Sequence, residues 1–401
     1  MTIHRPSFSL SDHLHSRLPN VGTTIFTVMS ALARQHGAVN LGQGFPDFDP
    51  DPLLLAEVTR AMAEGHNQYP PMAGLPELRE AVAESIEQRH GRRYDPGEEI
   101  TITAGATQAI LTALLAVVHP GDEVILLDPA YDSYEPGVRL AGGVPVRLPP
   151  GADGRPDLDA VAAHLSPRTR ALILNTPHNP TGQVWTAAEM RRLAALLAPT
   201  GVIVIADEVY ETMVFDGAPH QSVADWPTLA ERALRISSFG KSFHVTGWKV
   251  GAVAAPAALM AEFRKVHQFN VFTVNTPMQR ALSQFMTVQP QALREVAGFY
   301  QQRRDLFRTG LHPLLAQGLR LLPCEGTYFQ CVDYGRLPIP QARLDEDAFC
   351  RWLTSEIGVA AIPLSAFEAR PDPLRRVIRL CFAKKVETLE AALERLHKLA
   401  S

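Results

Sequence analysis

Apolar residues in the middle of the chain alternate between short runs and a helix-like spacing. The short runs are rich in Val, Ile and Leu and predict β-strands at residues 100–103, 123–127, 171–174, 202–206 and 234–237. Helical spacing predicts α-helices between them at residues 107–118 and 187–197. Strands and helices that alternate in this way form a sheet covered by helices on both faces. We therefore predict an α/β fold with a parallel sheet.

The pattern differs at both ends of the chain. Residues 1–50 end in a Gly/Pro-rich loop, and helices are predicted near residues 52–62 and 75–90. A long helix is predicted at residues 291–311. After it the predicted elements follow an α+β pattern, with two helices and with strands at residues 319–322, 328–332, 359–362 and 377–382. A chain of 401 residues is long enough for two cores. We predict a large domain at residues 51–290 and a smaller α+β domain at residues 291–401, which the N-terminal arm at residues 1–50 joins.

Composition narrows the class of protein. A formal net charge of −4 and the lack of a long basic run argue against a nucleic-acid partner. The longest apolar stretch, near residues 109–118, is far shorter than the ~18 residues of a membrane span. The four cysteines are far apart and form no metal-binding pattern with histidines, which fits reduced thiols and no metal site. We expect a cytoplasmic protein without a secretion signal.

Two lysines near the end of the last predicted strand are the first candidates for chemistry. Lys241 and Lys249 lie in the segment Ile236 to Gly251, which is rich in small, hydroxyl and aromatic residues. A lysine where a strand enters a Gly/Ser turn can lose its charge by desolvation and attack carbonyl groups. The alternative is that both are ordinary surface lysines.

Asp207 ends the apolar strand at residues 202–206, and Tyr210 follows it. Ligands of open α/β sheets gather beyond the carboxyl ends of the strands. A carboxylate there needs a cation, and a protonated pyridine nitrogen would be one. The alternative is a helix N-cap aspartate.

Polar and small residues follow two other predicted strands. Asn179, in Asn-Pro-Thr-Gly after the strand at residues 171–174, could donate to a phenolate oxygen, as could Tyr210. Ala104-Gly-Ala-Thr107 opens a helix and would let a phosphate approach its backbone N–H groups. Neither a dinucleotide nor a triphosphate motif is present. Ser238 and Lys249 would complete this phosphate site.

Two further residues could bind a planar ring and a carboxylate group. Tyr131 follows the strand at residues 123–127 and could stack on a planar ring, although a core aromatic is the alternative. Arg379 lies inside the apolar strand at residues 377–382, where its planar guanidinium group could donate two parallel hydrogen bonds to a carboxylate. An internal salt bridge is the alternative for this arginine.

Together these segments resemble the class I pyridoxal-phosphate aminotransferases over essentially the whole chain. The resemblance implies fold type I, with a mixed, mostly parallel sheet in the large domain and a smaller α+β domain. The closest likeness is to bacterial methionine aminotransferases and kynurenine/glutamine transaminases. The matching segments are 41–47, 67–69, 175–182, 207–210, 238–251, 324–329 and 378–384. Some kynurenine-type relatives carry a bulky aromatic near Ala106 and a histidine at Thr273, and their absence here argues against kynurenine as the main substrate.

The resemblance implies a role for each candidate residue. Lys241 would form the Schiff base with pyridoxal 5'-phosphate, Asp207 would pair with the ring nitrogen, and Tyr131 would stack on the ring. Asn179 and Tyr210 would hold the ring oxygen. The residues implied around the phosphate are Gly105, Ala106, Thr107, Ser238, Lys249 and, from a second subunit, Tyr69. Gly44, Asn179 and Arg379 would bind the substrate.

We therefore expect an aminotransferase that moves the amino group of an apolar or sulfur-containing amino acid to a 2-oxo acid. The donor would be methionine-like, with aromatic amino acids and glutamine also possible. Two alternatives stay open: a carbon–sulfur β-lyase with the same residues, and a non-catalytic ligand-binding protein on the same fold. The implied working unit is a homodimer with shared active sites.

Overall fold

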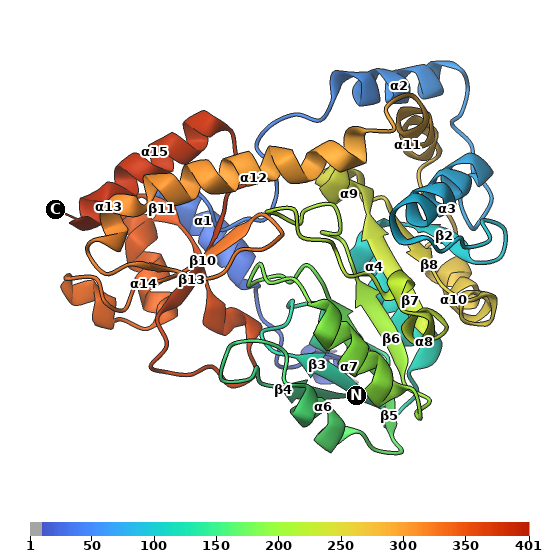
Figure 1. Cartoon of the computed structure of the whole chain (residues 1–401), viewed down its shortest axis with the longest axis horizontal. Coiled ribbons are helices and arrows are strands. Elements are labelled where there is room, and N and C mark those ends of the chain that lie inside the picture. Colours follow the sequence, from blue (N-terminus) through green and yellow to red (C-terminus); the bar gives the residue numbers. More distant parts are fainter. Residues whose placement is uncertain (1–9, 401) are drawn as a thin grey trace, which may run out of the picture.

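A seven-stranded sheet forms the centre of the larger part of the molecule in this computed structural model, which describes residues 10–400 (Figure 1). The strands are ordered β2-β8-β7-β6-β5-β3-β4. Their bounds are β2 (Ile100–Thr103), β3 (Glu123–Leu127), β4 (Val144–Leu148), β5 (Thr169–Asn175), β6 (Ile203–Asp207), β7 (Ala233–Ser238) and β8 (Gly251–Ala254). Only β8 runs antiparallel to its neighbours. The sheet is therefore mixed and mostly parallel, as the sequence predicts.

Helices cover both faces of this sheet. Successive side chains of the central strand β6 point to opposite faces and so contact different helices. Ile205 packs with α4 and α10, whereas Val204 and Ala206 pack with α6 and α7. The helices of this part are α2 (Pro52–Ala63), α3 (Pro76–His90), α4 (Gly105–Val117), α5 (Tyr134–Leu140), α6 (Leu158–His164), α7 (Ala187–Leu197), α8 (Pro227–Ala230), α9 (Phe239–Ser242), α10 (Ala257–Asn270) and α11 (Thr276–Val288). Burial on both faces explains why β6 is apolar without interruption.

A second, smaller sheet is built from the C-terminal part of the chain in the order β12-β13-β10-β9. Its strands and the separate pair β1 and β11 are β1 (Val39–Asn40), β9 (Arg320–Leu321), β10 (Phe329–Asp333), β11 (Val359–Ala360), β12 (Ile362–Pro363) and β13 (Val377–Cys381). The helices are α1 (Ile25–His36), α12 (Ala292–Gly310), α13 (His312–Leu315), α14 (Glu346–Trp352) and α15 (Val386–Leu396). Long helix α12 leads from the neighbourhood of α11 to this second part (Figure 1).

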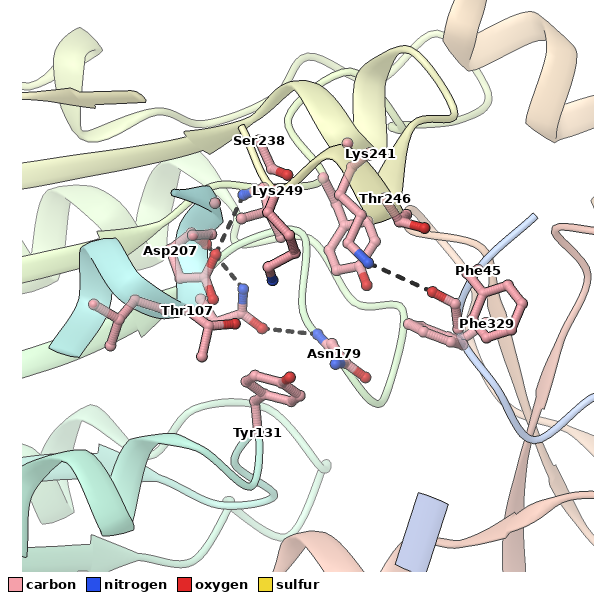
Figure 2. Close-up of a pocket in the computed structure, with 18 of the residues that line it drawn as sticks. Phe45, Thr107, Tyr131, Asn179, Asp207, Ser238, Lys241, Thr246, Lys249 and Phe329 are labelled. Carbon is pink, nitrogen blue, oxygen red and sulfur yellow. Dashed lines mark hydrogen bonds between the residues drawn. The ribbon is translucent and has the colours of Figure 1, made fainter. Parts of the chain in front are cut away.

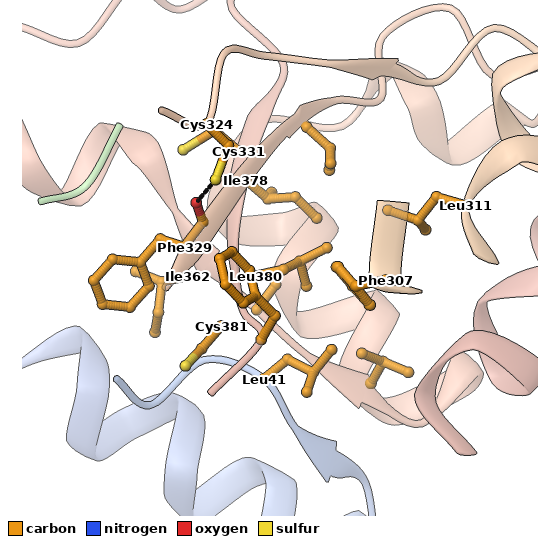
Figure 3. Packing of buried hydrophobic residues seen from close by; sticks show 14 of the residues in the cluster. Leu41, Phe307, Leu311, Cys324, Phe329, Cys331, Ile362, Ile378, Leu380 and Cys381 are labelled. Atoms are coloured by element: carbon orange, nitrogen blue, oxygen red, sulfur yellow. Dashed lines mark hydrogen bonds between the residues drawn. The ribbon is translucent and has the colours of Figure 1, made fainter. Parts of the chain in front are cut away.

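The N-terminal segment is attached to the C-terminal part rather than to the large sheet. β1 pairs in parallel with β11, and Leu41 packs in the same apolar cluster as Phe307, Leu380 and Cys381 (Figure 3). This attachment brings the loop after β1, which contains Gly44, next to β13. The exact domain bounds at residues 50 and 290 stay a prediction.

One expected strand is wrong in detail. The run at residues 359–362 forms two short strands, and β11 pairs with β1 whereas β12 pairs with β13. The chain changes partner at Ala361, which a run of apolar letters does not reveal. Within residues 10–400, no helix is long and apolar enough to cross a membrane.

Candidate active site

The carboxyl ends of β3, β5, β6 and β7 open into a cavity of about 380 Å³ (Figure 2). All the residues expected at the site except Tyr69 line this cavity. They are Gly44, Gly105, Ala106, Thr107, Tyr131, Asn179, Asp207, Tyr210, Ser238, Lys241, Lys249 and Arg379. The edge of the sheet therefore gathers residues that are more than 300 positions apart in the sequence.

Lys241 is held inside the cavity by the short helix α9, which directly follows β7. Its Nζ donates hydrogen bonds to the hydroxyl of Tyr328 at 2.8 Å and to the carbonyl of Gly44 at 3.4 Å. Burial lowers the pKa of Lys241 from 10.5 to about 8, although the nearby Asp207 opposes this change. A substantial fraction of the amine is therefore neutral near pH 8, and a neutral amine can attack a carbonyl. This position excludes an ordinary surface lysine.

Asp207 ends β6 and is 4% exposed. Its Oδ2 accepts a hydrogen bond from the hydroxyl of Tyr134 at 2.6 Å, and its Oδ1 accepts one from the backbone N–H of Val209 at 3.3 Å. Burial raises the pKa of Asp207 from 3.8 to about 6, and these hydrogen bonds limit the rise. A turn rather than a helix follows β6, so Asp207 is not a helix N-cap.

Arg379 lies on β13 and is 1% exposed. It donates to the amide oxygen of Asn179 at 2.6 Å and to the carbonyl of Gly42 at 3.0 Å, and its Nε has no hydrogen-bond partner. No ion pair joins it to a carboxylate anywhere in residues 10–400, so the internal salt bridge is absent. A buried cation without an acidic partner is costly unless an anion binds to it.

The first turn of α4 points toward Lys249 and provides an anion site. Gly105 has a φ of +77°, and a Cβ there would lie 3.3 Å from the Lys249 amine. No side chain caps the N-terminus of α4, so its N–H groups can serve an anion together with Lys249 and Ser238. Ala106 and Thr107 continue the same turn.

Tyr131 and Tyr210 line two other walls. Tyr131 lies on the side of the cavity opposite Lys241 and Ser238, so it is not a core aromatic (Figure 2). Tyr210 is buried, and its ring faces the Lys241 amine at 5.5 Å. Because Asn179 uses its amide oxygen for Arg379, only its Nδ2 group can donate toward a bound ring.

Tyr69 lies outside this cavity within one subunit. Its side chain is 81% exposed and packs edge to face on Phe272, with ring centroids 5.3 Å apart. The predicted contact of Tyr69 with the phosphate therefore needs another subunit.

Sequence reasoning missed three residues that complete the site. Tyr134 holds Asp207, Tyr328 holds Lys241, and Phe26 of α1 lines the cavity. Tyr328 falls in the matching segment at residues 324–329, and Tyr134 follows the candidate Tyr131 by three residues, but only the fold pairs them with their partners. Phe26 carries no sequence signal, since it lies in an amphipathic helix far from the other residues.

A half-buried lysine and a buried carboxylate at the edge of an α/β sheet, beside a helix N-terminus that can bind an anion, define a class of enzyme. The class consists of fold type I enzymes, which hold an aldehyde cofactor through a lysine. Pyridoxal phosphate fits the groups present. An anion site is available for its phosphate, an amine for its aldehyde and a carboxylate for its ring nitrogen, in a cavity of ordinary size for such a ligand.

Comparison with known proteins identifies the family. Residues 37–396 match the family model of class I and II aminotransferases. The chain is 50% identical to methionine aminotransferase of Escherichia coli (strain K12), with 96% of this chain and 98% of that protein covered. A solved Escherichia coli structure described as having a methionine aminotransferase function superposes with a TM-score of 0.92 at 50% identity, over 96% of this chain and 99% of that one.

A more distant relative is named for a different substrate. Kynurenine–oxoglutarate transaminase 1 of Rattus norvegicus is 34% identical, with 95% of this chain and 97% of that protein covered. The chain belongs to the class I and II aminotransferase family. It is an amino-acid aminotransferase that uses pyridoxal phosphate.

Proposed function

We propose that the protein transfers the amino group of an apolar or sulfur-containing amino acid, with methionine as the model donor, to a 2-oxo acid. The observation that carries the proposal is Arg379, a buried arginine without an acidic partner in the same cavity as Lys241 and Asp207. An α-carboxylate of the donor would supply the missing anion. The 50% identity to a methionine aminotransferase supports the choice of donor.

The walls of the cavity favour an apolar donor side chain. Phe26, Phe45, Ile110 and Phe329 line it, and its charged residues are Asp207, Lys241, Lys249 and Arg379. Each charged residue already has a proposed partner in the cofactor or the α-carboxylate. Within one subunit, no charged residue of the cavity lining is left to pair with a charge on the donor side chain. The cavity therefore disfavours donors with a second carboxylate or a basic side chain.

When bound, the cofactor supplies an electron sink that makes the Cα proton of the donor acidic. The chain supplies the groups around it. Asp207 would hold a proton on the ring nitrogen, and Asn179 and Tyr210 would donate to the ring oxygen. Lys241 would hold the cofactor through its amine, and the same amine, when free, would be the base that takes the proton from Cα.

The remaining site residues orient the two ligands. Tyr131 would stack on the ring. The phosphate would be held by Gly105, Ala106, Thr107, Ser238 and Lys249. Arg379 and the backbone of Gly44 would bind the α-carboxylate, and Asn179 would contribute to the same substrate site. A Cβ at residue 44 would lie 2.7 Å from the ring of Phe329, so only glycine allows this loop to approach the site so closely.

We further propose a homodimer in which each subunit lends Tyr69 to the other site. Tyr69, Phe269 and Phe272 are large exposed side chains on one stretch of surface, and Phe269 is 85% exposed. Such aromatic surface is typical of an interface between subunits. We also propose a cytoplasmic location, supported by four buried cysteines that are all unpaired.

Subunit mixing tests the shared site. Lys241→Ala subunits are mixed with Tyr69→Ala subunits under conditions that allow exchange, and one mixed dimer then contains one doubly defective and one intact site. Random reassortment should restore about a quarter of wild-type activity, because about half of the dimers are mixed and each has one good site. No recovery after verified exchange contradicts the shared site.

A donor screen tests the proposed reaction. Methionine, phenylalanine, glutamine, kynurenine and aspartate are each offered with several 2-oxo acids, and keto-acid formation is measured. We expect methionine to rank above aspartate and kynurenine in kcat/KM. A higher kcat/KM for aspartate contradicts the argument from the cavity walls. Release of pyruvate and ammonia from a donor with sulfur on Cβ, such as an S-alkylcysteine, indicates the lyase instead.

A further inference from the structure

Tyr328 joins three parts of the site through a single hydroxyl. Its OH donates a hydrogen bond to the carbonyl of Gly44 at 2.6 Å and accepts one from the Lys241 amine at 2.8 Å. The hydroxyl of Tyr210 makes a longer contact with it at 3.5 Å. A tyrosine hydroxyl has one proton to donate and two lone pairs to offer, so all its hydrogen-bonding capacity is used.

The position of this hydroxyl is fixed by the backbone and by packing. Tyr328 is fully buried, and its ring packs on Tyr300 and Phe329 with centroids 5.6 Å and 4.8 Å away. The preceding residue, Thr327, has a φ of +65°, which is rare for a β-branched residue and concentrates at functional sites. The Thr327 hydroxyl accepts a hydrogen bond at 3.1 Å from the backbone N–H of Phe329, two residues further on. The structure thus holds a strained backbone to aim this ring.

The Lys241 amine would be free whenever it is not covalently bonded to the cofactor, and the free amine needs a hydrogen-bond partner that holds it in place. A free lysine side chain has many rotamers, and ordering it costs up to about 2 kcal/mol of conformational entropy. In the cavity it also needs a hydrogen-bond acceptor, because an unpaired buried amine is costly. Asp207 is already engaged by Tyr134, and Tyr210 presents its ring face rather than its hydroxyl to Lys241.

We propose that Tyr328 is a positioning residue that receives the Lys241 amine whenever the amine is not bonded to another group. This inference rests on the proposed function, in which the donor displaces Lys241 and the free amine then takes the Cα proton. Tyr328 also donates to the carbonyl of Gly44, next to the proposed carboxylate site. It therefore fixes the position of the lysine amine relative to the donor. Burial raises the pKa of the Tyr328 hydroxyl well above its usual value, so it keeps the proton that it donates to Gly44.

The test uses Tyr328→Phe with Tyr300→Phe as the matched control. Both changes remove only a hydroxyl from a fully buried ring of the same aromatic cluster, so both proteins should fold. The Tyr300 hydroxyl has no partner among the described residues, whereas the Tyr328 hydroxyl has Lys241 and Gly44. The control therefore separates loss of the hydrogen bonds from loss of an oxygen atom.

Two measurements are made on each protein. The first is the rate at which methionine deuterated at Cα loses its deuterium, together with the isotope effect against ordinary methionine. We expect Tyr328→Phe to slow this step about 10- to 100-fold with a larger isotope effect, since a misplaced reacting group costs about this much. The second is stopped-flow capture of pyridoxal 5'-phosphate by the cofactor-free protein, followed through the visible band. Capture should slow about 10-fold in Tyr328→Phe, and Tyr300→Phe should stay within about twofold of wild type in both assays.

Several results would overturn the proposal. Rates within twofold of wild type for Tyr328→Phe, an equal loss in both variants, or a loss confined to the KM for methionine would each show that Tyr328 does not position Lys241. Failure of the proposed function looks different, because the wild-type protein itself would then leave the Cα deuterium in place. The wild-type measurement therefore comes first and separates the two failures.

Discussion

The burial of Asp207 predicts that the cofactor-free protein is destabilised by its own carboxylate. The pKa of Asp207 is about 6 in the folded chain, against 3.8 in an exposed carboxyl. Between these values the folded chain holds a proton that the unfolded chain releases, so stability falls as pH rises through this window. The cost vanishes well below pH 3.8 and is complete above pH 6. At about 1.4 kcal/mol for each pKa unit, it reaches about 3 kcal/mol.

The variant Asp207→Asn removes this cost and keeps the shape of the side chain. Its amide oxygen can still accept the backbone N–H of Val209, and its amide nitrogen can donate to Tyr134. The free energy of unfolding of cofactor-free Asp207→Asn should exceed that of wild type by about 1 kcal/mol at pH 4.5 and about 3 kcal/mol at pH 8. The same variant should lose most of its turnover, because an amide cannot hold a proton on the ring nitrogen.

Urea-induced unfolding of both proteins at the two pH values measures the difference. The control is Asp49→Asn, which changes an exposed aspartate and should stay within about 0.5 kcal/mol of wild type at both pH values. Pyridoxal phosphate should stabilise wild type more than Asp207→Asn, because only the carboxylate gains a cation. An Asp207→Asn protein that is no more stable than wild type at pH 8 would refute the reasoning from burial.

Three further changes test other parts of the site. Lys241→Ala should still bind pyridoxal phosphate but lose keto-acid formation by about 10²- to 10⁴-fold, because the group that moves the Cα proton is gone; near-native turnover would contradict this role. Arg379→Lys keeps the positive charge but loses the paired hydrogen bonds of the guanidinium group. The kcat/KM for amino acids should therefore fall about 10- to 100-fold, while kcat/KM for amines without a carboxylate should change little. Equal loss for both would make Arg379 structural. Gly105→Ala should weaken cofactor binding about 10-fold in a spectral titration, because a Cβ there would lie 3.3 Å from the Lys249 amine, in the space proposed for the phosphate; unchanged binding would argue against close approach at this turn.

The central sheet could be predicted because its strands are buried on both faces. Val204 and Ile205 point to opposite helix layers, and both must be apolar, which leaves an uninterrupted run in the sequence. The strands that went unpredicted lack this signal. β4 is a partly exposed edge strand that contains Pro145, and β8 consists of small residues around Val253.

Two residues of the candidate site could be predicted because their type conflicts with the local pattern of the sequence. Asp207 at the end of an apolar strand and Arg379 within one are costly unless they bind something, so each stands out in the sequence. Tyr134 and Tyr328 do not conflict with their neighbours, because an aromatic residue fits a core equally well. Their hydroxyls gain a role only when the fold brings Asp207 and Lys241 within 3 Å of them. Tyr69 is the opposite case, since its role depends on a surface of another subunit.

The covalent link between Lys241 and the cofactor is the central claim, and chemical trapping tests it most directly. The protein is saturated with pyridoxal phosphate, reduced with sodium borohydride, digested and mapped by mass spectrometry. We expect a single cofactor-derived mass on the peptide that contains Lys241, and none after the same treatment of Lys241→Ala. A cofactor mass on Lys249 or on the buried Lys384, with Lys241 unmodified, would contradict the assignment of Lys241.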